Sequence, residues 1–123
     1  MYTISLGTVT VTTHDTANPL SAVLAALGLA ADLKVHKLKF WPLLGNTNPV
    51  YVGLAAGAPG NVGATIMVGS TGVNVLRKVS KPAATGQQDH VVIGGEGNSV
   101  RVADYAVDVT TDGEGFQIFA ELV

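Results

Sequence analysis

The chain has 123 residues, of which seven are basic and nine acidic, so charged residues make up 13% of it. Ordinary soluble domains carry roughly 25% charged residues. A domain of this size still exposes a large surface, so we expect part of that surface to be covered by other protein. The formal net charge of −2 gives no attraction to nucleic acid, and the absence of cysteine excludes disulfides, thiolate metal sites and cysteine nucleophiles.

The length suits a single β-rich domain over 1–123 with its own core. The start of the chain has no basic segment followed by an apolar run, so no secretory signal is expected. The longest apolar stretch is Leu20–Leu33. It is interrupted by Asp32 and falls short of the about 20 residues that a membrane helix needs. We therefore expect no membrane partner.

Residues 2–13 form the first predicted strand region. Apolar side chains alternate there with β-branched polar ones, a pattern typical of a strand with one buried face. The alternation shifts near Gly7, which indicates a bulge or a bend. The segment is predicted as one long strand or two short ones.

A short helix is predicted over 19–27. Asn18 is a suitable N-cap, and Pro19 suits the first helical position because its missing N–H has no partner there. Gly28 stands where a left-handed residue ends a helix. The apolar residues recur at a spacing that puts them on one face: Leu20, Val23, Leu24 and Leu27.

The other side of this helix is apolar too, since it carries Ala22, Ala25 and Ala26. A helix with no charged side is enclosed on both sides. Either a neighbouring subunit covers the alanines, or the helix lies inside its own domain, and periodicity does not separate the two. We treat Ala22, Ala25 and Ala26 as candidate interface residues.

Residues 34–123 are predicted to be strands and turns. The first of these strands runs from Lys34 and is closed by Pro42, with Leu38 and Phe40 on one face and Lys37, Lys39 and Trp41 on the other. The lysines are interpreted as a solvated face or as a guard against edge pairing rather than as an acid-binding patch. Further strands are expected at 49–54, 64–68, 73–79, 90–93, 99–102, 104–111 and 116–123. An exposed loop is expected at 80–89.

The last two strands are predicted to form a hairpin. The turn Asp112-Gly113-Glu114-Gly115 supplies the positive φ that a tight reversal needs. Many short strands with one helix near the N-terminus are typical of a mainly β domain. We predict a β-sandwich or jelly-roll-like fold, or a small Greek-key barrel, with one short N-terminal α-helix.

The residues that catalysis and metal binding require are scarce. His14, His36 and His90 are far apart and show no metal-ligand spacing, so we expect hydrogen-bonded or solvated histidines. Asp108, Asp112 and Glu114 are a weak candidate for calcium, because their spacing is not that of an EF-hand. We predict no enzyme, no catalytic or cofactor-binding residue, no cofactor and no metal site.

Three aromatic residues have two interpretations. Phe40, Trp41 and Tyr51 are candidates for a sugar-stacking platform, although large aromatic residues more often fill a core or a subunit contact. We include Phe40 and Trp41, at the end of their strand, among the candidate interface residues.

Two segments resemble a pattern in the head decoration, or cement, proteins of tailed bacteriophages. One is Asn46-Thr47-Asn48-Pro49-Val50-Tyr51-Val52-Gly53, an Asn-rich turn that leads into an aromatic-valine-glycine strand. The other is residues 104–119, a strand, an Asp-Gly turn and a final strand. The chain departs from the pattern in its helix and in its 80–89 loop.

The resemblance implies a non-enzymatic protein on the outer surface of a phage capsid, made in the host cytoplasm. It implies a homotrimer that bridges subunits of the major capsid protein, its other partner. One alternative is a tail or fibre domain that binds glycans, for which exposed aromatic residues would argue. Another is a small β-fold enzyme or ligand-binding barrel, which predicts a deep pocket lined by histidines or carboxylates.

Overall fold

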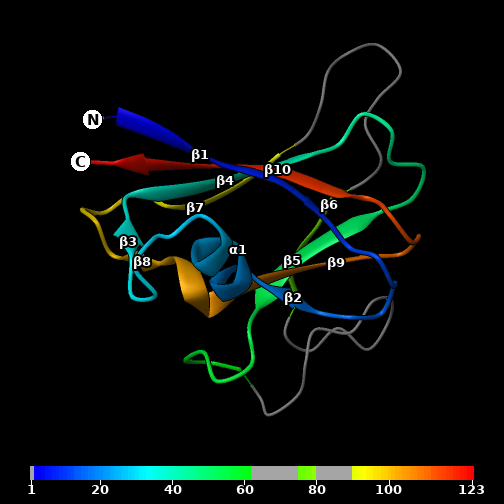
Figure 1. Cartoon of the computed structure of the whole chain (residues 1–123), viewed down its shortest axis with the longest axis horizontal. Coiled ribbons are helices and arrows are strands. Elements are labelled where there is room, and N and C mark those ends of the chain that lie inside the picture. The colour runs from blue at the N-terminus through cyan, green and yellow to red at the C-terminus, as the bar shows by residue number, and fades with distance from the viewer. Residues whose placement is uncertain (1, 62–74, 80–89) are drawn as a thin grey trace.

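The computed structural model describes residues 2–61, 75–79 and 90–123 (Figure 1). Two four-stranded antiparallel sheets dominate it. Sheet A has the order β1 (Tyr2–Thr10), β10 (Gly115–Leu122), β4 (Lys37–Pro42), β7 (Val91–Gly94). Sheet B has the order β2 (Asn18–Pro19), β9 (Tyr105–Val109), β5 (Val50–Leu54), β6 (Val75–Val79). A two-stranded ladder joins β3 (Lys34–Val35) to β8 (Val100–Arg101). The expected mainly β class is confirmed.

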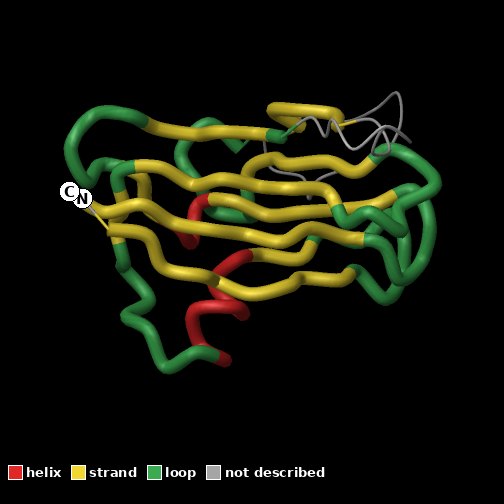
Figure 2. The backbone as a smooth tube through the Cα atoms, turned by 90° about the horizontal axis from the view of Figure 1, so that it is seen from above, coloured by secondary structure: helices red, strands yellow, loops and turns green. Residues whose placement is uncertain are grey.

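Both sheets contribute to one hydrophobic core. Phe40 of β4 and Phe116 of β10 are fully buried and pack edge to face, with ring centroids 5.9 Å apart. Val52 of β5 and Val107 of β9 belong to the same cluster. Helix α1 (Leu20–Ala26) adds Leu20 and Leu24. The strands run across the molecule side by side (Figure 2).

The predicted bulge in the first strand is confirmed. The pairing of β1 with β10 shifts register between Ser5 and Gly7, and Gly7 has a φ of +84°. The Gly7 N–H donates to Ser5 Oγ. Strand β1 is therefore continuous but kinked, and it ends at Thr10 rather than at residue 13.

The helix lies where it was expected, but its start differs. Asn18 and Pro19 pair with β9 as β2, and the helix begins at Leu20 without a side-chain cap. The N-cap interpretation of Asn18 is wrong, because its backbone serves a sheet and its side-chain amide donates to Thr16 O. Gly28, at a φ of +70°, follows the helix as predicted.

The predicted strand from Lys34 to Pro42 is two strands. His36 lies between β3 and β4, where its N–H donates to Glu121 O and its Nδ1 lies 2.8 Å from Gly97 O. Within β4 the expected alternation holds, since Leu38 and Phe40 are buried and Lys39 is not. Lys39 forms an ion pair with Glu121 on the neighbouring strand, and β4 is an inner strand, so its lysines do not guard an edge.

The predicted C-terminal hairpin is wrong. Both strands and the turn exist, with Gly113 at a φ of +83°. However, β9 pairs with β2 and β5, whereas β10 pairs with β1 and β4. The chain therefore crosses from sheet B to sheet A at this turn. The physical reason is that β10 has a partner on each side in sheet A, β1 and β4, and buries Phe116, Ile118 and Ala120 in the shared core.

The remaining expectations divide into three groups. Strands at 49–54 and 90–93 are confirmed within a residue or two as β5 and β7. Residues 99–102 form β8 followed by a 3₁₀ turn, η1 (Val102–Asp104), which was not predicted. The strand expected at 64–68 and the loop expected at 80–89 lie outside the described residues.

Candidate functional site

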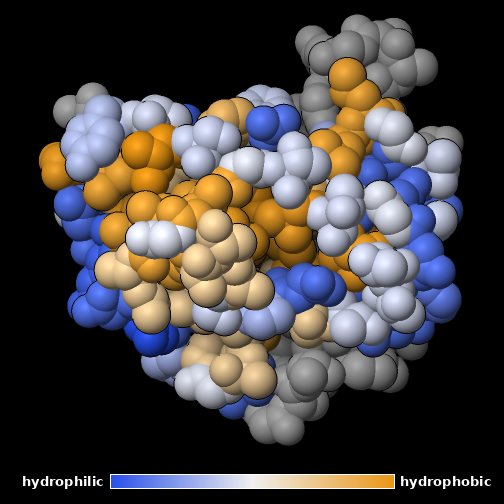
Figure 3. Space-filling view, in the orientation of Figure 1, coloured by the Kyte–Doolittle hydropathy of each residue, from blue (hydrophilic) through white to orange (hydrophobic). Residues whose placement is uncertain are grey.

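The side of α1 that faces away from the core is exposed. Ala22, Ala25 and Ala26 are all exposed, and Leu27, just after the helix, is 49% exposed. The segment between Asp15 and Asp32 contains no charged residue. Helix α1 lies on the same side of the molecule as β1 (Figures 1 and 2), and apolar side chains gather over the middle of this side (Figure 3). We call this surface the α1 face.

The exposure of these alanines separates the two interpretations made from the sequence. No element of the described chain encloses them, so they are not inner residues of the domain. Leu27 was expected on the buried stripe with Leu20 and Leu24, and this was wrong. The helix ends at Ala26 and turns at Gly28, which carries Leu27 out of the stripe.

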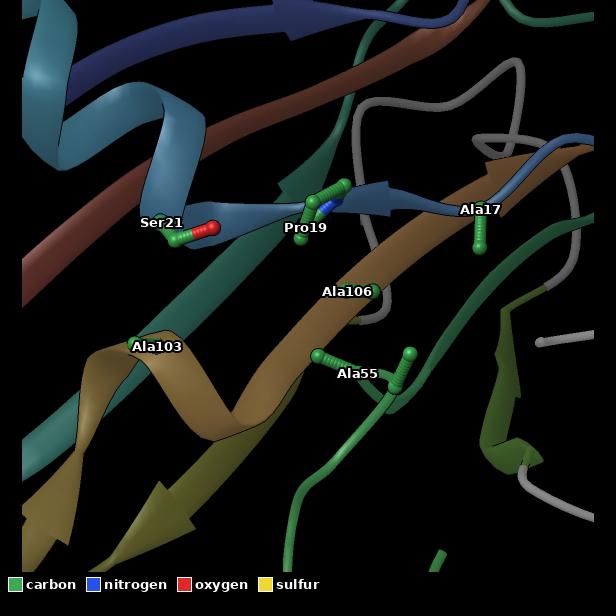
Figure 4. A pocket seen from close by; sticks show the side chains of 7 residues that line it. Ala17, Pro19, Ser21, Ala55, Ala103 and Ala106 are labelled. Carbon is green, nitrogen blue, oxygen red and sulfur yellow. The ribbon is translucent and has the colours of Figure 1, made fainter. Parts of the chain in front are cut away.

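A hollow of about 310 Å³ lies beside the start of α1 (Figure 4). Its walls come from three separate segments, and nearly all of the lining residues are small: Ala17, Pro19, Ser21, Ala55, Ala56, Ala103 and Ala106. The Ser21 hydroxyl is the only polar side-chain group among these lining residues. A hollow of this composition offers shape and apolar contact but no acid, base or nucleophilic pair.

The structure removes Phe40 from the candidate interface. Its exposure is 0%, and its ring packs on Phe116 inside the core. Burial also removes it, together with Tyr51 at 6% exposure, from any sugar-stacking platform. The strand alternation had already placed Phe40 with Leu38 on one face, and that face is the core.

Trp41 lies on the opposite, outer face of sheet A and is half-buried. Its ring stacks on His90, with centroids 4.0 Å apart and planes 7° apart. Next to it is a shallow depression of about 330 Å³ lined by Trp41, Pro42, Leu43, Leu44, Gln117 and Phe119. Leu44 is 76% exposed. Trp41 therefore does not belong to the α1 face. Together with Leu44 it forms part of a second apolar surface.

The three carboxylates considered for calcium serve separate purposes. Asp112 accepts from the His14 N–H and lies 2.7 Å from His14 Nδ1. Glu114 accepts from the N–H groups of Thr47 and Asn48. Within the described ranges no group of three or more histidines and acids is arranged to hold a metal ion.

The His14–Asp112 pair shifts both pKa values. Its hydrogen bond to Asp112 raises the pKa of His14, while hydrogen bonds from the backbone and ring of His14 lower the pKa of Asp112. The His14 Nε2 lies 4.0 Å from Asp15 Oδ2. The ring is thus held between two acids, which agrees with the expectation of a hydrogen-bonded or solvated histidine.

Asp108 is the most buried acid among the residues that the structure describes. Its exposure is 0%, and its Oδ1 accepts from the N–H groups of Thr16 and Val109. Its Oδ2 has no hydrogen-bond partner. Burial raises the pKa of this carboxyl against the opposing effect of those two N–H donors. The group anchors the segment that leads from β1 to β2.

The two segments of the phage-protein resemblance meet in space. The Asn46 side-chain amide donates to Gly115 O and accepts from Gly115 N, as a neighbouring strand would. Glu114 binds the next two residues of the Asn-rich turn. Gly115 itself touches β1, since a Cβ there would lie 1.9 Å from Val9 O. The Asn-rich turn, the Asp-Gly turn and the end of β1 thus meet at one hydrogen-bonded corner.

Sequence reasoning missed both hollows and the exposed Leu44. The alanines of the first hollow are distant along the chain, so no local pattern identifies them. Leu44 stands in the turn after Pro42, and a large apolar residue in a turn was a signal that the sequence offered.

Comparisons with protein-family models, with curated proteins and with solved structures found no match. Within the part of the chain that the structure describes, no helix is both long and apolar enough to span a bilayer.

Proposed function

We propose that the protein is a non-enzymatic structural subunit that associates with copies of itself and decorates the outside of a phage capsid. One observation carries the proposal. The α1 face exposes Ala22, Ala25, Ala26 and Leu27 within a segment that has no charge between Asp15 and Asp32.

The physical argument is the cost of leaving such a surface in water. Burying apolar surface stabilises a contact by roughly 25 cal/mol per Å². Small side chains such as alanine let a neighbour approach closely and lose little side-chain entropy when they are covered. Because a capsid repeats the same contact many times, modest individual contacts add to a strong clamp without a reactive group.

The finer fold assignment belongs to the same proposal. We assign the chain to the β-sandwich or jelly-roll-like domains. The shared core of the two four-stranded sheets supports this assignment. Such domains suit an outer shell protein, because their loops gather at the two ends of the sheets.

The assignment to a capsid rests on the resemblance of the Asn-rich and Asp-Gly turns to those of decoration proteins. Their mutual hydrogen bonds support it, because they make the two segments one structural unit. The partners proposed are the major capsid protein and further copies of this chain. The homotrimer that the resemblance implies stays a prediction.

Mass measurement and capsid binding test this function. Sedimentation equilibrium of the purified protein is expected to show an oligomer, and intact tailed-phage capsids are expected to retain it after pelleting. Ala25→Glu introduces a charge into the α1 face and should lower the oligomer fraction. Leu44→Glu introduces the same charge into the other apolar surface and is the matched control.

Each result has a clear meaning. A monomer at millimolar concentration that also fails to pellet with capsids would refute the proposal. An oligomer that tolerates Ala25→Glu but not Leu44→Glu would move the contact to the Trp41 side of the molecule.

The depression beside Trp41 favours a second candidate, a glycan-binding domain of a tail or fibre. Aromatic rings with a neighbouring amide are typical of sugar sites, and Trp41, Phe119 and Gln117 line this depression. A glycan array decides the question. Binding that is lost in Trp41→Ala and kept in Ala25→Glu would favour this candidate over capsid decoration.

A further inference from the structure

The free edge of β1 is the longest strand edge among the described residues. Strand β1 spans Tyr2–Thr10 and pairs with β10 on one side only. The other three outer strands of the two four-stranded sheets are short or carry features that discourage pairing. Strand β2 has two residues and contains Pro19, β7 ends in Gly94, and β6 has the sequence VLRKV, with two adjacent basic residues.

Strand β1 has almost none of these features that discourage pairing. Its sequence, YTISLGTVT, contains no charged residue and no proline. Natural proteins usually place lysine, proline or a bulge on an exposed edge to prevent pairing with another chain. Here the bulge at Gly7 is the single such feature, and it leaves Thr8, Val9 and Thr10 regular beyond it.

The backbone of this end is available for pairing. Val11 N donates to Glu114 O, and Val9 O faces Gly115. Since the hydrogen-bonding groups of a strand alternate between its two edges, Thr8 and Thr10 direct their N–H and C=O groups away from β10. Both residues are exposed.

The edge of β1 also adjoins the α1 face. Both lie on the same side of the molecule in two perpendicular views (Figures 1 and 2). Apolar side chains gather on that side (Figure 3). A partner that extends sheet A at β1 therefore also approaches α1.

We propose that β1 pairs antiparallel with β1 of a second copy of this chain, across a two-fold axis, with the α1 faces beside the new strand pair. The inference rests on the self-association given above as the proposed function and adds the surface that performs it.

Pairing with a second copy brings no like charges together along this edge. A strand laid against its own copy meets like charges wherever it carries any, and β1 carries none. Its threonines are suited to cross-strand pairs with each other. A two-fold contact uses the same patch on both subunits, so a single unguarded edge is sufficient. A three-fold contact would need two different patches.

Sedimentation equilibrium and amide hydrogen exchange test the inference on the full chain. We expect a mass twice that of the monomer rather than the threefold mass that the phage-protein resemblance implies. We also expect the Thr8 and Thr10 amides to exchange at least about tenfold more slowly in the dimer than at concentrations where it dissociates.

Two variants locate the contact. Thr8→Lys places a charge on the edge and should weaken dimerisation by about tenfold or more. Thr8→Pro removes the outward N–H while sparing the bonds to β10, and it should have the same effect. Thr12→Lys, at an exposed position just past β1, is the matched control and should leave the dimer unchanged. Thermal unfolding of each variant shows that it is folded.

The outcomes separate this inference from the proposed function. A trimer with unprotected Thr8 and Thr10 amides overturns the strand pairing and leaves the self-associating subunit intact. A dimer broken by Ala25→Glu and untouched by Thr8→Lys does the same. A protein that is monomeric in solution yet binds capsids overturns the pairing and keeps the capsid role.

Discussion

Gly115→Ala is expected to separate the end of β1 from β10. A Cβ at this position would lie 1.9 Å from Val9 O and 2.9 Å from Thr10 Cα. Both are backbone atoms, so no side-chain rotation relieves the overlap. The strands must move apart by more than about 1 Å to reach ordinary contact distances.

The magnitude follows from what this movement breaks. The Val11 N–H donates to Glu114 O at 2.9 Å, and the Gly113 N–H donates to Val11 O at 2.8 Å. Each backbone hydrogen bond contributes about 1 kcal/mol, and overpacking a tight site costs about 1–3 kcal/mol more. We therefore expect the free energy of unfolding to fall by about 3–5 kcal/mol.

Gly113→Ala is the matched control, because that glycine has open space but a φ of +83°. A left-handed alanine costs about 1–2 kcal/mol, so the control should lose less stability than Gly115→Ala. Urea denaturation measures both values, and hydrogen exchange of the Val11 amide reports the detachment of β1. The reasoning is refuted if Gly115→Ala costs no more than Gly113→Ala while the Val11 amide stays protected.

Three further predictions concern the core and the acids. Phe116→Ala should lower the free energy of unfolding by about 3–5 kcal/mol, because it leaves a cavity against Phe40 that cannot refill; chemical denaturation measures this. The His14–Asp112 pair should stabilise the fold most between the ordinary pKa values of 3.8 and 6.5, with the effect lost below as Asp112 is protonated and above as His14 loses its proton. Thermal unfolding against pH should therefore show a maximum that His14→Gln flattens. Since the pKa of Asp108 is raised, the folded protein loses stability as pH rises from the ordinary carboxyl pKa through the raised one, and Asp108→Asn should abolish that loss in the same titration.

The positions of several strands and turns could be predicted from the sequence, but the partners of the strands could not. Alternation located β1 and β4, because the side-chain period of a strand depends on neighbouring residues alone. The turn residues that bound it located β5. The Asp-Gly turn was also recognisable. The turn residues do not determine which strands pair with the two strands that they join. Strands β9 and β10 both pair with strands far away in the sequence. A good hairpin turn is thus compatible with a crossing between sheets.

The same limit applies to the candidate site. The alanines of α1 were identifiable because a helix period places Ala22, Ala25 and Ala26 on one side. Their exposure depended on which elements pack against the helix, and no local pattern contains that. The prediction that Phe40 lies at an interface was wrong for a related reason. The size of its side chain suggested a subunit contact. Whether its face of the strand is core or surface depends on β10 and sheet B.

The placement of β10 determines the order in which the protein can fold as it leaves the ribosome. This final strand lies between β1 and β4, and Tyr2 pairs with Leu122. Strand β1 therefore emerges long before β10 and has no partner until the chain between them has been made. Such distant pairings are slow to form, so nascent chains spend that interval with an uncharged, unpaired β1 open to neighbouring chains.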